Sequence, residues 1–246
     1  FLCSFCINGL YGATGFYPRF LFDLLSSSHE ISYEGCLLQA FVMYSFACCE
    51  MSILAVMAYD RYVAICQPLR YHSIMTRRRL AALVGSSLAH MFYFSLSISV
   101  TSTKLCGSKL QKLFCVNVMI YELACSKSDT LANNIIAHAT IQIYVLHGFF
   151  IVWTYVHLAI TCTNSKEDRV KFIQTCIPHL VSLIVFIFVV MFDVMFMRFG
   201  SKTLPQSLMN LIGIKFVIFP PLVNPIIYGF KLQKIRHRVA GYVNKH

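Results

Sequence analysis

The sequence predicts an all-α membrane protein that crosses the bilayer several times. Hydrophobic residues make up 57% of the 246 residues and charged residues only 13%, about half the usual charged fraction of ~25%. Apolar runs long enough to cross a hydrocarbon core of ~30 Å recur along the whole chain. The runs are continuous, whereas a transmembrane β-barrel needs alternating segments of ~10 residues. The pattern therefore excludes both a soluble domain and a β-barrel.

Six apolar runs form the predicted spans of a single domain, residues 1–246. Pro18 and Arg19 are expected to end the first run. Because Phe1 already lies inside an apolar run, we expect an N-terminally truncated chain that starts within a span. The predicted spans are about 1–17, 36–60, 80–100, 134–162, 176–199 and 207–230.

The basic residues predict the orientation of these spans. Thirteen of the 21 Lys and Arg residues lie on the side that carries Arg61, seven lie on the opposite side, and Lys215 lies within a span. The positive-inside rule therefore places Arg61 in the cytoplasm. The net charge of +11 is therefore explained by the orientation of the chain in a lipid bilayer, and it does not indicate a nucleic acid as partner.

Asp60 and Arg61 follow about twenty mostly apolar residues, in the stretch MAYDRYVAIC from Met57 to Cys66. A charged side chain within a span costs roughly 3 kcal/mol or more, so such a pair is a functional candidate. The Asp60 carboxylate can hold the Arg61 guanidinium until a competing partner replaces it. The pair therefore has the chemistry of a switch.

The glycines and cysteines of the first run have structural interpretations. Gly9, Gly12 and Gly15 recur every three residues, so another backbone can approach one helix face closely. Cys3 and Cys6 form a C-x-x-C pair without the strand that a redox site requires.

Four further cysteines lie on the outer side, where thiols are oxidised. Cys36 begins the second run, and Cys106, Cys115 and Cys125 lie in the long loop before the fourth. They predict two disulfides, with three possible connectivities.

The sequence predicts no metal site, no cofactor and no enzyme. Isolated histidines on helices are more often packing residues than ligands, and no nucleophile–base arrangement is present. The histidines of the third and fourth runs are His90, His138, His147 and His157.

A proline hinge is predicted in the sixth run. Pro225 removes a backbone donor, and the neighbouring Asn224 can satisfy the carbonyl that this frees. A helix can move at such a place.

Three stretches carry a resemblance to a known family. They are MAYDRYVAICQPLRY (57–71), TCIPHL (175–180) and PPLVNPIIYG (220–229). With the span pattern and the three-cysteine loop, the chain resembles the odorant receptors of the rhodopsin-like G protein-coupled receptor family. The prolines 220–221 and MRFG (197–200) resemble the fish or class I type.

The resemblance implies a seven-helix bundle whose first helix is missing here. It implies disulfides Cys36–Cys115 and Cys106–Cys125. It also implies that Arg61 leaves Asp60 on activation and meets a Gs/olf-type G protein. The residues that the resemblance assigns to this coupling are Asp60, Arg61, Tyr62, Tyr155, His179, Asn224, Pro225 and Tyr228.

Three features depart from the family pattern, and one of them is the absence of a tryptophan in the third run. Gly9 stands where an aspartate is usual, so a sodium-type polar site is not expected. Ile187 replaces the usual aromatic toggle of the fifth run, between Phe186 and Phe188.

Ligand contacts are expected in the outer half of the bundle, in a mostly apolar pocket. Residues three and four apart share one helical face, although core packing explains each residue equally well. Glu50 and Asp193 can contact a ligand or serve an internal role. The candidate pocket residues are Met43, Tyr44, Ala47, Cys48, Met51, Ala139, Thr140, Ile143, Tyr144, Val190, Met191, Val194, Asn210 and Ile214.

The resemblance thus implies an odorant-activated receptor in the plasma membrane of an olfactory sensory neuron. Its partners are a small-molecule odorant and a heterotrimeric G protein. The alternatives are a non-olfactory rhodopsin-like receptor and, more remotely, a transporter, for which the inverted repeats are missing.

Overall fold

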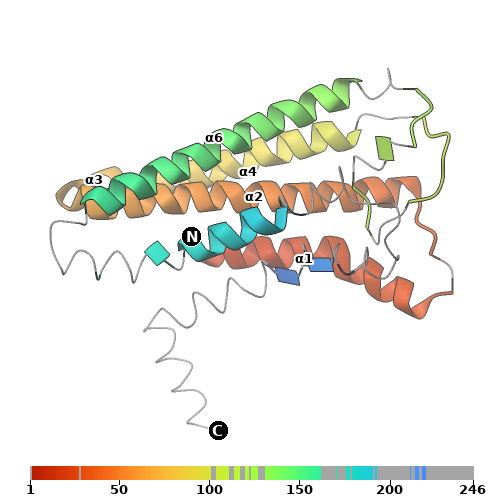
Figure 1. Cartoon of the computed structure of the whole chain (residues 1–246), viewed down its shortest axis with the longest axis horizontal. Helices are drawn as coiled ribbons and strands as arrows, with labels where there is room; N and C mark the ends of the chain where they lie inside the picture. The colour runs from red at the N-terminus through yellow and green to blue at the C-terminus, as the bar shows by residue number, and fades with distance from the viewer. Residues whose placement is uncertain are drawn as a thin grey trace, which may run out of the picture.

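In the computed structural model, the regular structure of the described part is helical, apart from one isolated antiparallel bridge between Leu105 and Ala124 (Figure 1). The described residues are 2–27, 29–100, 104–110, 114–116, 120–121, 123–126, 131–161, 170, 176–177, 179–190, 192, 211, 214–215 and 218–219. The elements are α1 (Leu2–Leu25), α2 (Tyr33–Cys66), the 3-10 helix η1 (Pro68–Arg70), α3 (Tyr71–Ile74), α4 (Arg77–Val100) and α6 (Leu131–Thr161). An apolar helix also covers His179–Val190.

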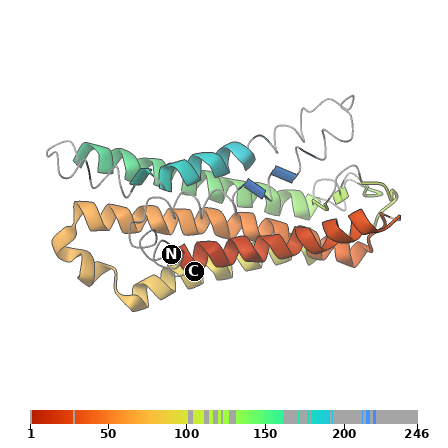
Figure 2. The same cartoon turned by 90° about the horizontal axis from the view of Figure 1, so that it is seen from below.

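Helix α2 lies at the centre of the bundle and contacts α1, α4 and α6 (Figures 1 and 2). Among the described residues, α2 and the Asn134–Thr161 part of α6 are the helices long and apolar enough to cross a bilayer. The most apolar stretch of α2 is 72% buried, whereas that of α6 is 11% buried. The first is therefore the core of the bundle, and the second faces its surroundings.

The ends of α2 follow from local chemistry. The Ser32 side chain accepts a hydrogen bond from the Gly35 backbone N–H at 3.1 Å, which caps the first turn. The helix ends at Cys66, two residues before Pro68, because the residue preceding a proline disfavours helical geometry. It thus runs past the predicted boundary at residue 60, and Asp60 and Arg61 lie within its last two turns.

Helix α1 also runs past its predicted end. It continues through Pro18 to Leu25, so the expectation that Pro18 and Arg19 end the first helix is wrong. Arg19 stabilises the extension, since its Nε donates to Asp23 Oδ2 at 3.1 Å, one turn further along. Its Nη2 also donates to the Glu30 carbonyl at 2.6 Å, which ties the helix to the following loop.

Two glycines allow α1 to lie against α2. A Cβ on Gly12 would come within 2.5 Å of Phe46 Cδ2, and one on Gly15 within 2.7 Å of Val42 Cγ1. Contacts this short do not occur between carbon atoms, so any larger residue would push the helices apart. Close packing at Gly12 and Gly15 is confirmed, but the atoms that approach are side chains of α2 and not its backbone.

The outer end of the bundle is closed by two disulfides, Cys36–Cys115 and Cys106–Cys125. This is the pairing that the resemblance implied. Gln39 strengthens the closure, because its amide accepts a hydrogen bond from the Cys115 N–H at 2.9 Å and donates one to the Gly15 carbonyl at 3.0 Å. One buried side chain of α2 thus joins the outer loop to α1.

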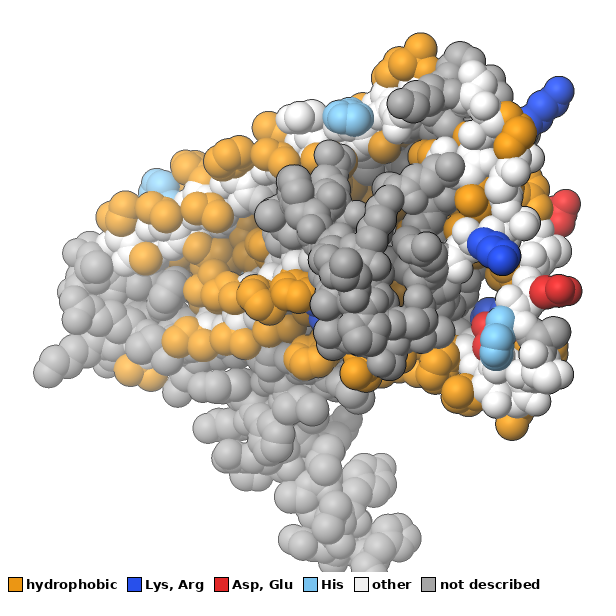
Figure 3. All heavy atoms as spheres, turned by 45° about the vertical axis from the view of Figure 1, so that its right-hand side comes forward, with side chains coloured by type: hydrophobic (Ala, Val, Ile, Leu, Met, Phe, Trp, Pro, Cys, Tyr) orange, Lys and Arg blue, Asp and Glu red, His pale blue; other side chains and the backbone are white. Residues whose placement is uncertain are grey.

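The described surface is divided by polarity. Hydrophobic side chains cover the flanks of the helices, and charged side chains gather at one end of the molecule (Figure 3). On α6, Phe149 is 70% exposed and Leu146 is 66% exposed. Large apolar side chains exposed along a whole helix fit contact with lipid and not with water.

Candidate functional site

A buried carboxylate at the inner end of α2 is held from two sides. The Arg61 Nε donates to Asp60 Oδ2 at 2.9 Å, and its Nη2 donates to the same oxygen. The Tyr71 hydroxyl donates to the other oxygen, Oδ1, at 2.9 Å. Asp60 is 2% exposed, whereas the Arg61 side chain is 37% exposed. The Asp60 carboxylate is therefore held in the interior, whereas the Arg61 guanidinium is partly accessible at the surface.

Tyr71 begins α3, and the short element η1 brings it back to the end of α2. Burial raises the pKa of Tyr71, and the hydrogen bond to the Asp60 carboxylate raises it further. The phenol therefore keeps its proton at neutral pH and remains a donor. Sequence reasoning did not assign this residue a role, although the motif that carries the resemblance ends on it.

Tyr62, the next residue after Arg61 on α2, packs against two aromatic side chains of α6. Its ring centre lies 5.6 Å from that of Trp153 and 5.7 Å from that of His157, which it meets edge-on. This aromatic contact holds α2 and α6 together beside Asp60 and Arg61.

Tyr155 and His179 form a second buried contact in the same half of the bundle. The Tyr155 hydroxyl is hydrogen-bonded to His179 Nδ1, and the two rings stack at 5.5 Å between centres. Their exposed fractions are 6% and 1%. The contact joins α6 to the His179–Val190 helix, and it was not predicted from the sequence. The remaining coupling candidates, Asn224, Pro225 and Tyr228, lie outside the described residues.

A polar contact in the core involves a residue that sequence reasoning missed. The Asn8 side chain donates to Glu50 Oε2 at 2.8 Å and to the Phe46 carbonyl at 3.1 Å. Both polar residues are buried, whereas Gly9 is half-buried. Glu50 therefore has an internal partner on α1, and Asn8 is the residue of the first run that faces it. Asn8 lies one position before Gly9, the residue that stands where the family usually has an aspartate.

The fifth run places an aromatic side chain in the core, one position before Ile187. Phe186 is 3% exposed and belongs to the main core cluster, whereas Ile187 is 39% and Phe188 is 67% exposed. Phe186 is therefore the aromatic residue of this helix that faces α2 and α6.

The structure brings several candidate pocket residues together in the core. Met51, Ala47, Tyr144 and Val190 belong to one cluster, to which α2, α6, the His179–Val190 helix and Phe5 of α1 contribute. Tyr144 also packs on Cys48.

The other candidates are more scattered. Met43 shares a second cluster with Ile214, and Tyr44 packs beside the Cys36–Cys115 disulfide. Thr140 bonds to its own helix at the Ile136 carbonyl, and Ala139 is exposed. Ile143 is half-buried. Met191, Val194 and Asn210 lie outside the described residues.

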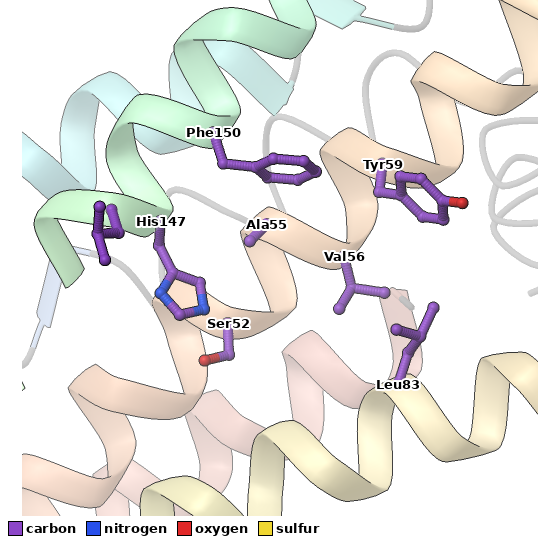
Figure 4. Close-up of a pocket in the computed structure, with 8 residues that line it drawn as sticks. Ser52, Ala55, Val56, Tyr59, Leu83, His147 and Phe150 are labelled. Atoms are coloured by element: carbon purple, nitrogen blue, oxygen red, sulfur yellow. The ribbon is translucent and has the colours of Figure 1, made fainter. Parts of the chain in front are cut away.

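The candidate pocket residues do not line either of two cavities in the described part of the chain. One of about 460 Å³ lies between α2, α4 and α6 (Figure 4). The other, of about 340 Å³, lies at the start of α4 beside Arg78 and Arg79. The described side chains include no group of three or more His, Cys, Asp or Glu residues that could hold a metal ion.

A helical bundle with apolar flanks, a disulfide-closed outer end and a buried Asp–Arg–Tyr contact at its inner end has the features of a rhodopsin-like receptor. The family model of the olfactory receptors matches residues 1–245. The chain belongs to this family.

Individual relatives agree with this assignment. The chain is 35% identical over 216 residues to human Olfactory receptor 51V1, a match that covers 85% of this chain and 66% of that receptor, just under two thirds of its length. It is 32% identical over 252 residues to human Olfactory receptor 51E2, covering 98% of this chain and 76% of the relative. Human Olfactory receptor 6K3 is 32% identical over 242 residues, covering 97% of this chain and 72% of the relative. The class I receptors of the 51 group among these relatives agree with the type indicated by the sequence.

Membership of this family implies a seven-helix fold and a multi-pass membrane protein that is not an enzyme.

Proposed function

We propose that this chain is an odorant-activated G protein-coupled receptor of the plasma membrane. A small molecule bound in the outer half of the bundle opens a cytoplasmic cleft around Arg61, and a Gs/olf-type G protein binds there. Asp60, Arg61, Tyr62, Tyr155 and His179 act in this switch. The described part of the chain supports the proposal at the inner end.

The observation that carries the proposal is the two-sided contact of Asp60. Its carboxylate accepts from Arg61 on one oxygen and from Tyr71 on the other. A buried carboxylate needs such donors, because an unpaired buried charge is costly. When Arg61 leaves, Asp60 loses one of its donors. The guanidinium of Arg61 then needs a new acceptor to replace the carboxylate. A G protein that presents backbone or carboxylate oxygens to Arg61 supplies that acceptor.

The contact between Tyr155 and His179 connects the switch to a movable element. The His179–Val190 helix is tied to α6 by this hydrogen bond and packs on Met51 and Leu54 of α2 through the core cluster. An outward displacement of its inner end has to break the contact or carry Tyr155 with it. Either change alters the position of α6 relative to the end of α2, because Tyr62 of α2 packs on Trp153 of α6.

The outer half of the same core cluster supplies the ligand end. Ala47, Met51, Tyr144 and Val190 come from three helices and are mostly apolar, with the Tyr144 hydroxyl as a polar group. A small, partly hydrophobic molecule that separates these side chains would displace the His179–Val190 helix relative to α2. Ligand binding and displacement are then coupled through direct contact.

The test is a cAMP reporter assay in cells that express the receptor and are exposed to a panel of small odorants. With any odorant that activates the receptor, we expect Arg61→Ala to abolish the response while the amount of receptor at the cell surface is kept. Arg70→Ala removes an exposed arginine from the adjoining element η1. It serves as the control for the loss of one positive charge at the same membrane face.

The result that would overturn the proposal is a normal odorant response in Arg61→Ala. A complete absence of response to every odorant, with the receptor at the surface, would instead exclude an odorant as the ligand.

A further inference from the structure

The cavity between α2, α4 and α6 lies apart from the expected ligand site. It has a volume of about 460 Å³, within the range of ~300–1,000 Å³ that is usual for small-molecule sites. Of the residues at its rim, Leu146 is 66% exposed and Phe150 is 37% exposed. The cavity therefore opens on the flank of the bundle that faces lipid, and a ligand can reach it from the bilayer.

One wall of the cavity carries a buried hydroxyl group without a partner. Ser52 on α2 is 1% exposed, and its Oγ has no hydrogen-bond partner among the described residues. Helical serines commonly bond to their own backbone, as Ser45 does to the Phe41 carbonyl at 2.8 Å. An unsatisfied hydroxyl in an apolar interior is unfavourable, so a group that bonds to it is bound more tightly.

A hydrogen-bond acceptor lines the same cavity. Figure 4 shows the His147 ring of α6 next to Ser52 at the same end of the cavity. His147 Nδ1 lies 2.8 Å from the Ile143 carbonyl. Since a carbonyl only accepts, Nδ1 carries the proton, and in the neutral ring Nε2 has a free lone pair. The pair thus offers one donor, the Ser52 hydroxyl, and one acceptor.

Apart from Tyr59, which carries a phenol hydroxyl, the remaining lining residues are apolar. Val56 of α2, Leu83 of α4 and Phe150 of α6 close the cavity around its polar end (Figure 4). The Ser52 oxygen is closed to solvent in the structure, so a ligand hydroxyl reaches it only after the Ser52 side chain turns toward the cavity. That hydroxyl then satisfies both polar groups, since it donates to His147 Nε2 and accepts from Ser52. A ketone or an ether accepts from Ser52 but leaves Nε2 unsatisfied, and an alkane satisfies neither.

We propose that this cavity is a second small-molecule site, which binds an uncharged, mainly apolar alcohol dissolved in the bilayer. Ser52 lies near the middle of the 34-residue helix α2, only about 4 Å along the helix axis from its centre. The polar groups of lipids lie roughly 15 Å from the centre of a bilayer. The hydroxyl of a lipid anchored at the membrane surface therefore does not reach Ser52, and a small alcohol does.

The site is tested by photolabelling the receptor in lipid nanodiscs with an octanol that carries a diazirine group. We expect labelling of the α2 and α6 segments that line the cavity. Competition should be strong with 1-octanol, weaker with 2-octanone and absent with octane. Ser52→Ala and His147→Phe should each reduce the labelling of these segments about fivefold or more, the effect of one lost hydrogen bond.

Two matched controls separate the site from general partition into the membrane. Ser86→Ala removes an exposed hydroxyl of α4 that bonds to its own backbone. His138→Phe removes an α6 histidine with the same backbone contact as His147 but outside the cavity. Neither should change the labelling. Leu83→Phe fills the cavity from α4 without touching either polar group, and it should block the labelling.

Labelling spread evenly over the exposed face of α6, or equal labelling in Ser52→Ala and Ser86→Ala, would overturn the inference. The result is independent of G protein coupling, because Arg61→Ala should label normally.

Discussion

Removing one hydroxyl from the inner end of the bundle should make the receptor active without ligand. In the structure Tyr71 donates to Asp60 Oδ1 at 2.9 Å, while Arg61 occupies Oδ2. Tyr71→Phe removes this donor and keeps the ring. We assign the Tyr71 bond to the resting state alone, with the Asp60 carboxylate hydrated once Arg61 has left. Loss of the bond then lowers the stability of the resting state and leaves the active state unchanged.

The magnitude follows from the chemistry of the contact. A hydrogen bond to a charged group contributes roughly 1.5–3 kcal/mol. Tyr71 is only partly buried, so water can replace part of the lost bond, and the effect lies near the lower limit. A loss of about 1.4 kcal/mol is a tenfold change in an equilibrium constant. If the active state is rare at rest, ligand-independent activity therefore rises about tenfold.

The assay is ligand-independent cAMP production, divided by the amount of receptor at the cell surface. Ser73→Ala is the matched control, because it removes a hydroxyl from α3 that bonds to the Arg70 carbonyl and not to Asp60. We expect normal basal activity in this control. Unchanged basal cAMP in Tyr71→Phe, at normal surface levels, would refute the role assigned to the contact.

Three further predictions concern the stability of the purified receptor, measured by thermal unfolding. Gly12→Ala should cost about 1–3 kcal/mol, because its Cβ would lie 2.5 Å from Phe46 Cδ2. Gly85→Ala, with nothing within 4 Å of its Cβ, should gain up to about 1 kcal/mol; an equal effect at both glycines would contradict the packing argument. Removing the Cys36–Cys115 disulfide should cost about 4.5 kcal/mol and removing Cys106–Cys125 about 3 kcal/mol, because their sequence separations are 79 and 19; a larger loss from the second would contradict the loop-length argument. Asn8→Ala should cost about 1–3 kcal/mol through the bond to Glu50 Oε2, and an unchanged unfolding temperature would show that this contact contributes nothing.

The features predicted correctly from the sequence depend on local chemistry. Gly12 and Gly15 indicate close packing because no other residue leaves room for a neighbouring helix. The outer cysteines indicate disulfides because of their compartment, whereas their pairing came from the resemblance. The predicted end of α1 was wrong because the contacts of Arg19 with Asp23 and Glu30 compensate for the proline inside the helix. Those contacts depend on a loop conformation that sequence does not specify.

The polar contacts were harder to predict, because they depend on the rotation of each helix. Successive residues on a helix point about 100° apart, so a shift of one position exchanges Asn8 for Gly9 as the neighbour of Glu50. Phe186 and Ile187 differ in the same way, at 3% and 39% exposed. Periodicity identifies the buried face of a helix, but the partner across it is fixed only when the helices are packed.

The arrangement around α2 indicates how a signal can cross the membrane. This helix is continuous over 34 residues, about 50 Å, and has no proline and only Gly35 near its start. Its outer end is fixed by the Cys36–Cys115 disulfide, and its inner end holds Asp60. A helix without a hinge and fixed at its outer end does not transmit a change by bending. We therefore infer that the signal travels through the helices that pack on α2. Among the described elements, the His179–Val190 helix contacts both the outer part of the core cluster and Tyr155 at the inner end. Its displacement along a stationary α2 is the change that would release Arg61.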